Sequence, residues 1–478
     1  MESQEKLTGK AKLSYALGAV GKDMVYMLSA SYVLYYFQDV MGVSAVAMGV
    51  ILLVARIFDA FNDPLMGTIV AKTRTRWGKF RPWLLIGTLT NAVVLFAMFA
   101  APLSLRDTSG MVAYAAIAYI LWGVTYTMMD IPYWSMIPAF TEGGKERENL
   151  TTLARSCAGV GSAIITIVTM IAVNALGRLA GGTVNSEIEI LGFKYFSAVV
   201  ALLFIVFTVL TCVNVKEKST SQMETVSVRQ MFGALIKNNQ ALAVVVTIVL
   251  INCAIYITSN LVIYFFKYDF GGTGWYNSYT LFNTFGGGVQ ILSMMLLYPA
   301  LRRRFTNMRI FYISLIMGMC GYVVLLGLAF TGMNSVFVLF VPALFIFATS
   351  GLLNILTTVF LANTVDYGEL TLGRRDESVI FSMQTFVVKL ASGIAAFIAS
   401  LCLQINKLSD KAVEEADKAV DWSLGVSEAA KIGLRMTMTV IPIVGLAIAV
   451  FWFRKKYILT DEKVAEISAQ VRKLHEKV

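Results

Sequence analysis

The sequence predicts an all-α membrane protein in which twelve transmembrane helices form two bundles of six. Composition is the first observation: 57% of the 478 residues are apolar and 15% are charged, whereas a soluble domain carries about 25% charged residues. The second observation is a series of about twelve apolar runs, and the third is a polar stretch that separates them six and six. This composition excludes a soluble enzyme, a disordered chain and a nucleic-acid binder, despite a net charge of +10.

Each apolar run has the length of about 20 residues that a membrane-spanning helix needs. The runs of the first half are Leu13–Met41, Ala45–Ala71, Pro82–Leu103, Met111–Phe140, Leu150–Leu176 and Tyr195–Val213. Those of the second half are Ala241–Lys267, Tyr276–Leu301, Ile310–Thr331, Ser335–Thr364, Val379–Ile405 and Ala429–Phe453. The N-terminus is polar and lacks a signal-peptide core followed by a cleavage site, so the first run is expected to be an uncleaved span.

Four segments follow from this pattern. We expect an N-terminal six-helix bundle over residues 1–213, a cytoplasmic middle loop over 214–240, a C-terminal six-helix bundle over 241–454 and a cytoplasmic tail over 455–478. Two halves of six spans are typical of transporters built from parallel repeats, in which the substrate site lies between the halves near mid-membrane.

The basic residues predict the orientation of the chain in the bilayer. If both termini are cytoplasmic, 27 of the 40 Lys and Arg residues fall on the cytoplasmic side and only 7 on the opposite side. Because basic residues concentrate in the cytoplasmic loops of membrane proteins, we expect both ends inside. The same distribution accounts for the positive net charge without a nucleic-acid partner.

Charged residues inside the apolar runs are the main candidates for function, because a charge at membrane depth is costly and usually lines an internal pathway. The second run contains Asp59, Asn62 and Asp63, preceded by Arg56. Asp59 and Asp63 are four residues apart and share one face of a helix. Two carboxylates and an amide oxygen suit a small hard cation such as Na⁺ or Li⁺, or a proton. The alternative is a structural ion pair in which Arg56 or Lys389 neutralises the carboxylates.

The fourth run carries a second pattern. Tyr126, Asp130 and Trp134 recur every four residues and form one stripe. A carboxylate accepts hydrogen bonds from sugar hydroxyls, and an indole ring offers a flat face to a pyranose. The stripe therefore predicts a site for a neutral sugar. The alternative is helix packing, with Trp134 as an interfacial anchor.

Three further runs contribute polar groups. Lys22 and Asp23 are adjacent in the first run, and Arg155 lies in the fifth. Thr385 and Lys389 are four residues apart in the eleventh run and share a helix face. Lys389 can balance the aspartates of the second run when the cation is absent, or it can neutralise one of them permanently.

The sequence gives no indication of an enzyme or of a cofactor. The only histidine, His475, lies in the polar tail, which excludes a histidine-based catalytic triad. The five cysteines occur singly in apolar stretches, so their spacing indicates neither a zinc site nor a disulfide framework. No set of nucleophile and base appears, and the coupling ion is the only inorganic partner expected.

Five segments carry a resemblance to a known family: Lys12–Asp23, Asp59–Asp63, Arg76–Trp83, Trp122–Pro132 and Val365–Glu369. Together they resemble the glycoside–pentoside–hexuronide:cation symporters, and within that family they look most like the melibiose carriers. The similarity spans nearly the whole chain. It implies a major facilitator superfamily fold and symport of a glycoside, a galactoside or a related oligosaccharide, with Na⁺, Li⁺ or H⁺. The expected location is the bacterial cytoplasmic membrane, where the chain would function by alternating access.

The resemblance also implies roles for individual residues. The cation site would be formed by Asp59, Asn62, Asp63 and Thr127, with Na⁺ at Asp59 and Asp63. The sugar-contacting or charge-balancing residues would be Lys22, Asp23, Tyr126, Asp130, Trp134, Arg155, Thr385 and Lys389. Two positions depart from the melibiose carriers, because Asn354 stands where they have a tryptophan and Asn363 where they have an aspartate. These departures leave the identity of the sugar open.

The mechanism expected is coupled symport by a monomer. A cation that neutralises Asp59 and Asp63 would let the second, fourth and eleventh spans approach and complete the sugar site, with reciprocal coupling between the two ligands. Asp23 and Asp130 would repel an acidic sugar, which favours a neutral glycoside. The alternatives are a pentoside or glucuronide symporter of the same family and a sodium-coupled lysolipid transporter. A sugar receptor is disfavoured because it would usually carry a long signalling extension.

Overall fold

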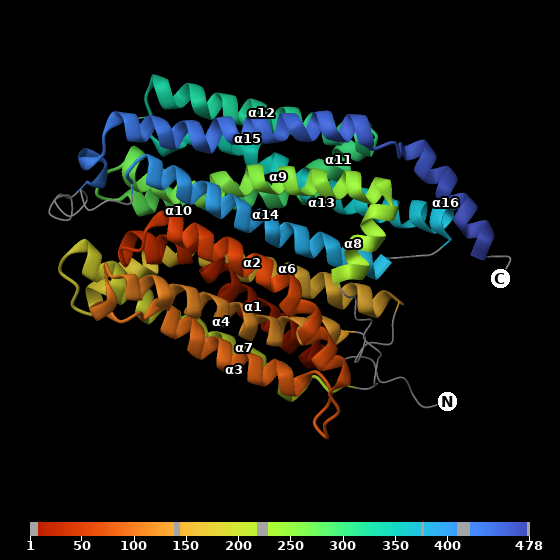
Figure 1. Ribbon diagram of the computed structural model, residues 1–478, viewed down its shortest axis with the longest axis horizontal. Helices are drawn as coiled ribbons and strands as arrows, with labels where there is room; N and C mark the ends of the chain where they lie inside the picture. Colours follow the sequence, from red (N-terminus) through yellow and green to blue (C-terminus); the bar gives the residue numbers. More distant parts are fainter. Residues whose placement is uncertain are drawn as a thin grey trace. The chain divides into compact units, whose positions relative to one another are not determined.

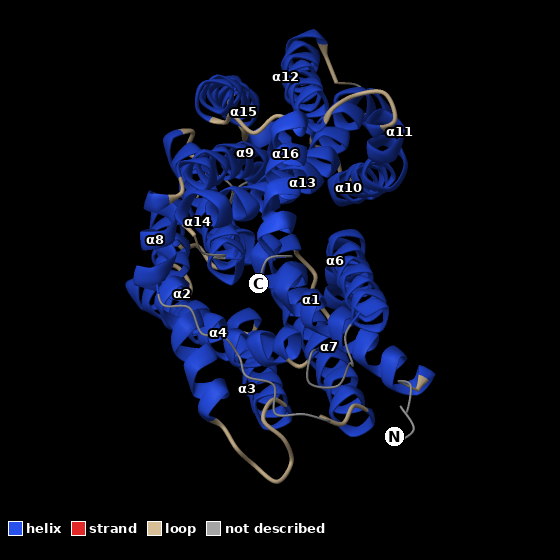
Figure 2. Ribbon diagram, turned by 90° about the vertical axis from the view of Figure 1, so that its right-hand side faces the viewer, coloured by secondary structure: helices blue, strands red, loops and turns tan. Residues whose placement is uncertain are grey.

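The computed structural model describes residues 8–137, 144–217, 228–333, 335–373, 377–408 and 421–475. Every regular element in these residues is a helix, apart from an isolated β-bridge between Thr75 and Gly78 (Figure 2). The all-helical fold class predicted from the composition is confirmed. The chain divides into two compact units, Met1–Thr225 and Val226–Val478, and each is described by itself.

The first unit consists mainly of six long helices, drawn from red to yellow in Figure 1. Its elements are α1 (Gly9–Tyr35), η1 (Tyr36–Val40), α2 (Ala45–Lys72), α3 (Arg81–Phe99), η2 (Leu103–Leu105), α4 (Ser109–Ser135), α6 (Gly144–Leu179) and α7 (Asn185–Asn214). Helix α1 packs against α6 and α7, while α4 packs against α2 and α3. Gly21 lets α1 approach α7 closely, because a Cβ at this position would lie 3.2 Å from the Cα of Phe204.

The second unit contains the remaining helices, green to blue in Figure 1. They are α8 (Val228–Lys237), α9 (Asn239–Tyr264), η3 (Phe265–Phe270), α10 (Trp275–Leu292), η4 (Ser293–Leu297), α11 (Tyr298–Arg302), α12 (Asn307–Thr331), α13 (Val336–Leu372), α14 (Glu377–Ile405), η7 (Trp422–Gly425), α15 (Glu428–Lys456) and α16 (Asp461–His475). Helix α9 packs against α14 and α15, and α13 packs against α10 and α12.

The described residues contain eleven helices that are long and apolar enough to cross a membrane. These helices correspond to eleven of the twelve predicted runs, and the remaining run is α1. Helix α1 has 27 residues, but Lys22 and Asp23 lower its hydropathy near its midpoint. Its length and its packing between neighbours of the first unit place it with the other spans.

Two helices lie in segments where the sequence predicts only a loop and a tail. Helix α8 falls in the expected middle loop, and α16 falls in the expected tail. Helix α8 has 10 residues, about half of what a span needs, and it is amphipathic. Its Leu235 is buried, whereas its Arg229 and Lys237 are exposed. Helices of this kind lack the long apolar run by which a sequence indicates a span.

The first long helices of the two units, α1 and α9, end in the same way, which indicates an internal duplication. Helix α1 continues into the π-helix η1, and α9 continues into the π-helix η3. A glycine with positive φ follows each π-helix. Gly42, with φ 74°, follows η1, and Gly271, with φ 70°, follows η3. The residues before them also match, since Val33-Leu-Tyr-Tyr-Phe in one unit corresponds to Val262-Ile-Tyr-Phe-Phe in the other. Hydropathy alone reveals only the six-plus-six division.

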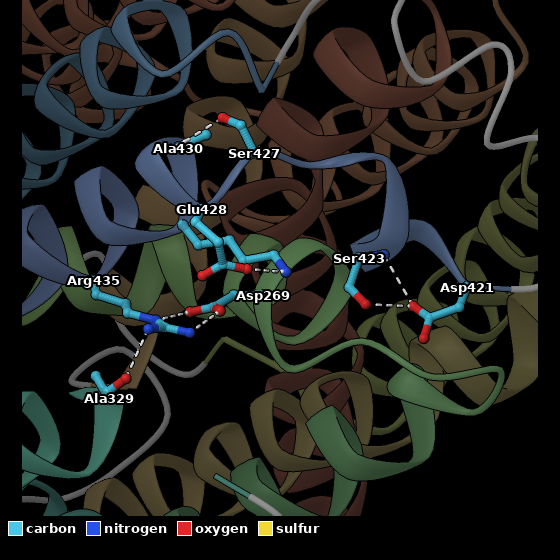
Figure 3. A network of polar contacts seen from close by, with 9 residues as sticks. Asp269, Ala329, Asp421, Ser423, Ser427, Glu428, Ala430 and Arg435 are labelled. Carbon is cyan, nitrogen blue, oxygen red and sulfur yellow. Dashed lines mark hydrogen bonds and ion pairs between the residues drawn. The ribbon is translucent and has the colours of Figure 1, made fainter. Parts of the chain in front are cut away.

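Polar contacts fix these two helix ends to the last long helix of each unit, α7 or α15. In the first unit the Tyr35 hydroxyl donates to Glu189 Oε1 of α7 over 2.8 Å. In the second unit Asp269 of η3 accepts two hydrogen bonds of 2.6 Å from Arg435 of α15 (Figure 3). Arg435 also donates to the carbonyl oxygen of Ala329 at the end of α12 over 2.7 Å. Bidentate pairs of this kind are among the stronger hydrogen bonds. Together with the bond to Ala329, the pair joins η3, α12 and α15 of the second unit.

Glu217 ties the end of α7 to the start of α3. Its carboxylate accepts hydrogen bonds from the backbone N–H groups of Lys79 at 2.7 Å, Phe80 at 3.0 Å and Arg81 at 3.0 Å. The Arg81 guanidinium donates in return to the carbonyl oxygen of Val215 over 2.8 Å. Free N–H groups at a helix start favour an anion, so Glu217 caps α3 and anchors the last described residues before the second unit.

Replacing this cap is expected to destabilise the first unit. In Glu217→Ala three backbone N–H groups lose their acceptor, which costs about 1–3 kcal/mol. The melting temperature of the purified protein in detergent should fall by roughly 2–4 °C for each kcal/mol lost. The matched control is Glu462→Ala on α16, whose side chain is exposed. Equal melting temperatures for both variants would contradict the capping role.

Candidate functional site

Helix α4 carries two polar clusters of the first unit on different sides. One cluster lies between α2 and α4, and the other lies between α1 and α4, with a contribution from α6. Neighbouring residues of α4 take part in different clusters: Thr127 contacts α2, while Tyr126 contacts α1.

The α2–α4 cluster brings together the carboxylates of α2 and small residues of α4. Thr127 Oγ1 donates to Asp63 Oδ1 over 2.9 Å. One turn earlier, Asp59 lies against Gly123, where an added Cβ would be 3.2 Å from Asp59 Oδ1. Asp59 and Asp63 are four residues apart on α2, and Gly123 and Thr127 are four residues apart on α4. The two contacts therefore lie about one turn apart along the same interface between α2 and α4.

Arg56 neutralises part of this cluster. Its Nη1 atom lies 3.1 Å from Asp59 Oδ2, and the two side chains are only 7% and 8% exposed. The guanidinium carbon is 5.8 Å from the ring centroid of Tyr119 on α4. The three ionisable groups Arg56, Asp59 and Asp63 therefore carry one net negative charge when all are ionised. The Arg56 pairing that the sequence offers as an alternative is present at Asp59.

Asn62 supplies the amide of the predicted cation set. Its Nδ2 atom is buried and has no hydrogen-bond partner among the described residues. The described residues contain no group of three or more His, Cys, Asp or Glu side chains placed to hold a metal ion. The candidate oxygen donors are thus two carboxylates, a hydroxyl and an amide.

Lys22 is the centre of the α1–α4 cluster. Its Nζ atom lies 3.2 Å from Asp23 Oδ1 and 2.9 Å from Asp130 Oδ1. It also lies 3.4 Å from the hydroxyl oxygen of Tyr126. The Lys22 side chain is 5% exposed, whereas that of Asp130 is 31% exposed. The lysine is thus fully enclosed, and one of its carboxylate partners remains accessible.

Trp134 lies beside two cations. Lys22 Nζ is 4.9 Å from the ring centroid of Trp134, and the guanidinium carbon of Arg155 is 4.0 Å from it. Such cation–π contacts are favourable when they are shielded from water. Arg155 comes from α6, so three helices contribute to this cluster. The ring contact with Arg155 is a feature that the spacing within the fourth span does not reveal.

The two site residues predicted in the eleventh span lie in the second unit. Thr385 and Lys389 are on α14, where Thr385 is exposed and Lys389 is half-buried. Beside them, Gln384 Nε2 donates to Thr358 Oγ1 of α13 over 3.2 Å. The expected charge balance between Lys389 and the aspartates of α2 stays a prediction. Of the two departures noted above, Asn354 on α13 is exposed and Asn363 is half-buried.

Several residues near the clusters do not stand out in the sequence. Gly123 lies one turn before Thr127, and Tyr119 lies one turn before Gly123, so the three share a face of α4. These residues are four apart, as Asp59 and Asp63 are, and this shared spacing can be read from the sequence. What the sequence does not contain is the fact that α2 and α4 are neighbours.

Comparisons with known proteins agree with this architecture. An uncharacterized symporter of Bacillus subtilis, YjmB, is 28% identical over 485 residues and covers 100% of this chain and 97% of its own. The raffinose carrier protein of Pediococcus pentosaceus is 26% identical, over 97% of this chain and 71% of its own. A crystal structure of a bacterial homologue of the human lysosomal transporter Spinster, inward-facing and unoccupied, has a TM-score of 0.63 at 11% identity, covering 96% and 97%. This last likeness shows the fold alone.

The sequence pattern of the MFS/sugar transport protein family matches residues 14–461. The predicted major facilitator fold is thereby confirmed, as is the prediction of a multi-pass membrane transporter rather than an enzyme. The expected closeness to the melibiose carriers stays a prediction. The match covers almost the whole chain, and the protein therefore belongs to the MFS/sugar transport protein family.

Proposed function

We propose that the protein is a symporter that moves a neutral glycoside, a galactoside or a related oligosaccharide, together with Na⁺, Li⁺ or H⁺. The observation that carries the proposal is that two clusters of charged side chains share helix α4. Thr127 links α4 to Asp63, and the adjacent Tyr126 links it to Lys22. A ligand at one cluster can thus bias the position of a helix that the other ligand also contacts, which is the physical requirement for coupling.

The α2–α4 cluster is the proposed cation site. Asp59, Asn62, Asp63 and Thr127 supply hard oxygen donors of the kind that Na⁺ and Li⁺ prefer. With Arg56 included, the charges of the three ionisable side chains sum to one net negative charge, and a net charge inside a membrane is costly. One monovalent cation removes that charge. This balance supports a coupling ion of charge +1 held at Asp59 and Asp63.

The α1–α4 cluster is the proposed sugar site. Lys22 and Arg155 together offset the charges of Asp23 and Asp130, so the four groups have no net charge. Donors and acceptors remain available for sugar hydroxyls, and Trp134 offers an aromatic face. A neutral cluster of this kind supports a neutral substrate over an acidic one. Arg155, stacked on Trp134, is proposed to share or yield that ring when the sugar binds.

The cycle would proceed by alternating access. Binding of the cation neutralises the α2–α4 cluster and stabilises its contact with α4, which completes the sugar site on the other side of that helix. Sugar must then tighten cation binding by the same factor, because coupling is reciprocal. The two six-helix halves would rock to expose the site inward. Thr385 and Lys389 are proposed to contribute from the second half.

The proposed orientation rests on the distribution of basic residues. We place the protein in the bacterial cytoplasmic membrane with both termini inside, as a monomer. The basic hairpin between α2 and α3, which contains Arg74 and Arg76, would then lie on the cytoplasmic surface. The remaining candidates are a pentoside or glucuronide symporter and, with less support from the sugar-type stripe, a sodium-coupled lysolipid transporter.

Uptake of a substrate panel tests the class of sugar. Proteoliposomes are incubated with radiolabelled galactosides, raffinose, xylosides, glucuronides and a lysophospholipid, each with and without a Na⁺ gradient. A neutral galactoside should be accumulated best, because the α1–α4 cluster has no net charge to offset an acidic group. Preferential uptake of glucuronide, or of the lysophospholipid, would overturn the choice of substrate.

Removal of one carboxylate tests the cation site. In Asp59→Cys the proposed site loses an oxygen ligand and one negative charge, so sugar-stimulated Na⁺ uptake should fall to the level of protein-free liposomes. Binding of sugar to the purified protein should remain detectable, because the α1–α4 cluster is intact. The control is Asp107→Asn in the loop before α4, which should couple normally. Undiminished sugar-stimulated Na⁺ uptake in Asp59→Cys would rule out the cation role.

A single added methyl group tests the geometry of the same site. In Gly123→Ala the new Cβ would lie 3.2 Å from Asp59 Oδ1, which forces the carboxylate or the helix to shift. The displaced carboxylate is a proposed ligand, so Na⁺ affinity should weaken, by about fivefold for each kcal/mol lost at the site. Gly159→Ala on α6 is the matched control, because a Cβ there meets nothing within 4 Å. Equal Na⁺ affinities for the two variants would contradict the proposed site.

A further inference from the structure

Tyr15 and Tyr133 form a reciprocal contact between α1 and α4. The hydroxyl of Tyr15 donates to the carbonyl oxygen of Tyr133 over 2.5 Å, and the hydroxyl of Tyr133 donates to the carbonyl oxygen of Tyr15 over 2.6 Å. Their rings are stacked, with centroids 4.4 Å apart and planes inclined by 8°. The residues are 0% and 1% exposed. Gly18 provides the room, because a Cβ there would lie 3.1 Å from Tyr133 Cε2.

The pair adjoins the α1–α4 cluster. Tyr15 precedes Lys22 by seven residues, so they lie on one face of α1 about 10 Å apart along the axis. Tyr133 is three residues from Asp130 on α4, and its ring is 5.8 Å from Lys22 Nζ. Its ring also meets that of Trp134 edge to face, with centroids 5.2 Å apart. The pair therefore contacts both the central lysine and the aromatic residue of the cluster.

The atoms that accept these two hydrogen bonds indicate that the tyrosine pair controls the relative position of α1 and α4. Both hydroxyls donate to backbone carbonyl oxygens, so each of these bonds depends on the position of the opposite helix itself. A shift of α1 along α4, or a rotation of either helix, would break both bonds and the ring stack together. The 2.9 Å contact between Lys22 Nζ and Asp130 Oδ1 needs the same register, because the two groups come from these two helices.

We propose that Tyr15 and Tyr133 are positioning residues, which hold α1 and α4 in the register that assembles Lys22, Asp130 and Trp134 into one site. This inference rests on the proposed sugar site. The reciprocal bonds join α1 to α4 and are separate from the α2–α4 contact, so the α2–α4 cluster keeps its geometry when the pair is weakened. Loss of the pair should therefore lower the affinity for sugar and leave the intrinsic affinity for the cation, measured without sugar, unchanged.

The test removes the hydroxyls and keeps the rings. The purified variants Y15F, Y133F and the double variant are titrated with raffinose, a nitrophenyl α-galactoside and a nitrophenyl β-xyloside, and separately with Na⁺ alone. Each single variant should raise the Kd of the probe that the unmodified protein binds best by about fivefold, the effect of one neutral hydrogen bond. The double variant should depart from additivity, because the two bonds depend on one register. The Kd for Na⁺ should stay within about twofold of the unmodified protein.

Tyr114 provides the matched control on the same helix. Its hydroxyl donates to the carbonyl oxygen of Ala97 on α3 over 2.7 Å, a bond of the same kind away from the cluster. Y114F should leave the sugar Kd unchanged. If Y15F and Y133F lower the melting temperature with the sugar Kd unchanged, or if Y114F raises the sugar Kd equally, the pair is only structural and the proposal is overturned.

Two further measurements separate this proposal from the proposed function. Asp130→Asn should abolish sugar binding, and full binding in that variant would overturn the sugar site itself. Hydrogen exchange needs no ligand: backbone amides around residues 15–22 and 126–134 should exchange faster in Y15F and Y133F than in Y114F. Unchanged exchange there would overturn the positioning role, even if none of the three sugar probes binds.

Discussion

The need to neutralise charge inside membrane-spanning helices is the constraint on which the first unit depends. Lys22 is enclosed between Asp23 and Asp130, and Arg56 is enclosed beside Asp59. A buried charge that loses its partner is strongly destabilising. These ionic contacts therefore hold α1 against α4 and preserve the shape of α2 beside α4. Hydrogen bonds are more directional than ion pairs. The neighbouring hydrogen bonds of Tyr15, Tyr133 and Thr127 therefore fix the register of the helices at these contacts.

The two units share a scaffold and differ in chemistry. Both end their first long helix in a π-helix followed by a glycine of positive φ, and both fix that end to their last long helix. One uses Tyr35 with Glu189, and the other uses Asp269 with Arg435. The duplicated backbone thus preserved a structural task, while the side chains that perform it changed. Both charged clusters described above lie in the first unit, and in the second unit the amide of Gln384 on α14 donates to the hydroxyl of Thr358 on α13.

Much of the candidate site follows from helical periodicity. The spacing of Asp59 and Asp63, and that of Tyr126, Asp130 and Trp134, places each set on one face of its helix whatever the tertiary fold. The contact of Arg155 with Trp134 and the close approach of Gly123 to Asp59 do not follow in this way. They join helices that are separated along the chain. Periodicity tells which side chains point the same way, but it carries no information about which helix faces them.

The sequence by itself determined the helical fold class, the number of spans within one, and the faces that carry charge, because hydropathy and the 3.6-residue period are local properties. The tertiary structure decided which helices are neighbours, and so assigned Tyr126 and Thr127 to different clusters and paired Tyr15 with Tyr133. It also revealed α8 and α16, whose apolar faces are too short to be read as spans. In a bilayer, apolar surface alone does not select a partner helix. Close packing at small residues and specific polar contacts do so, and these exist only once the helices have met.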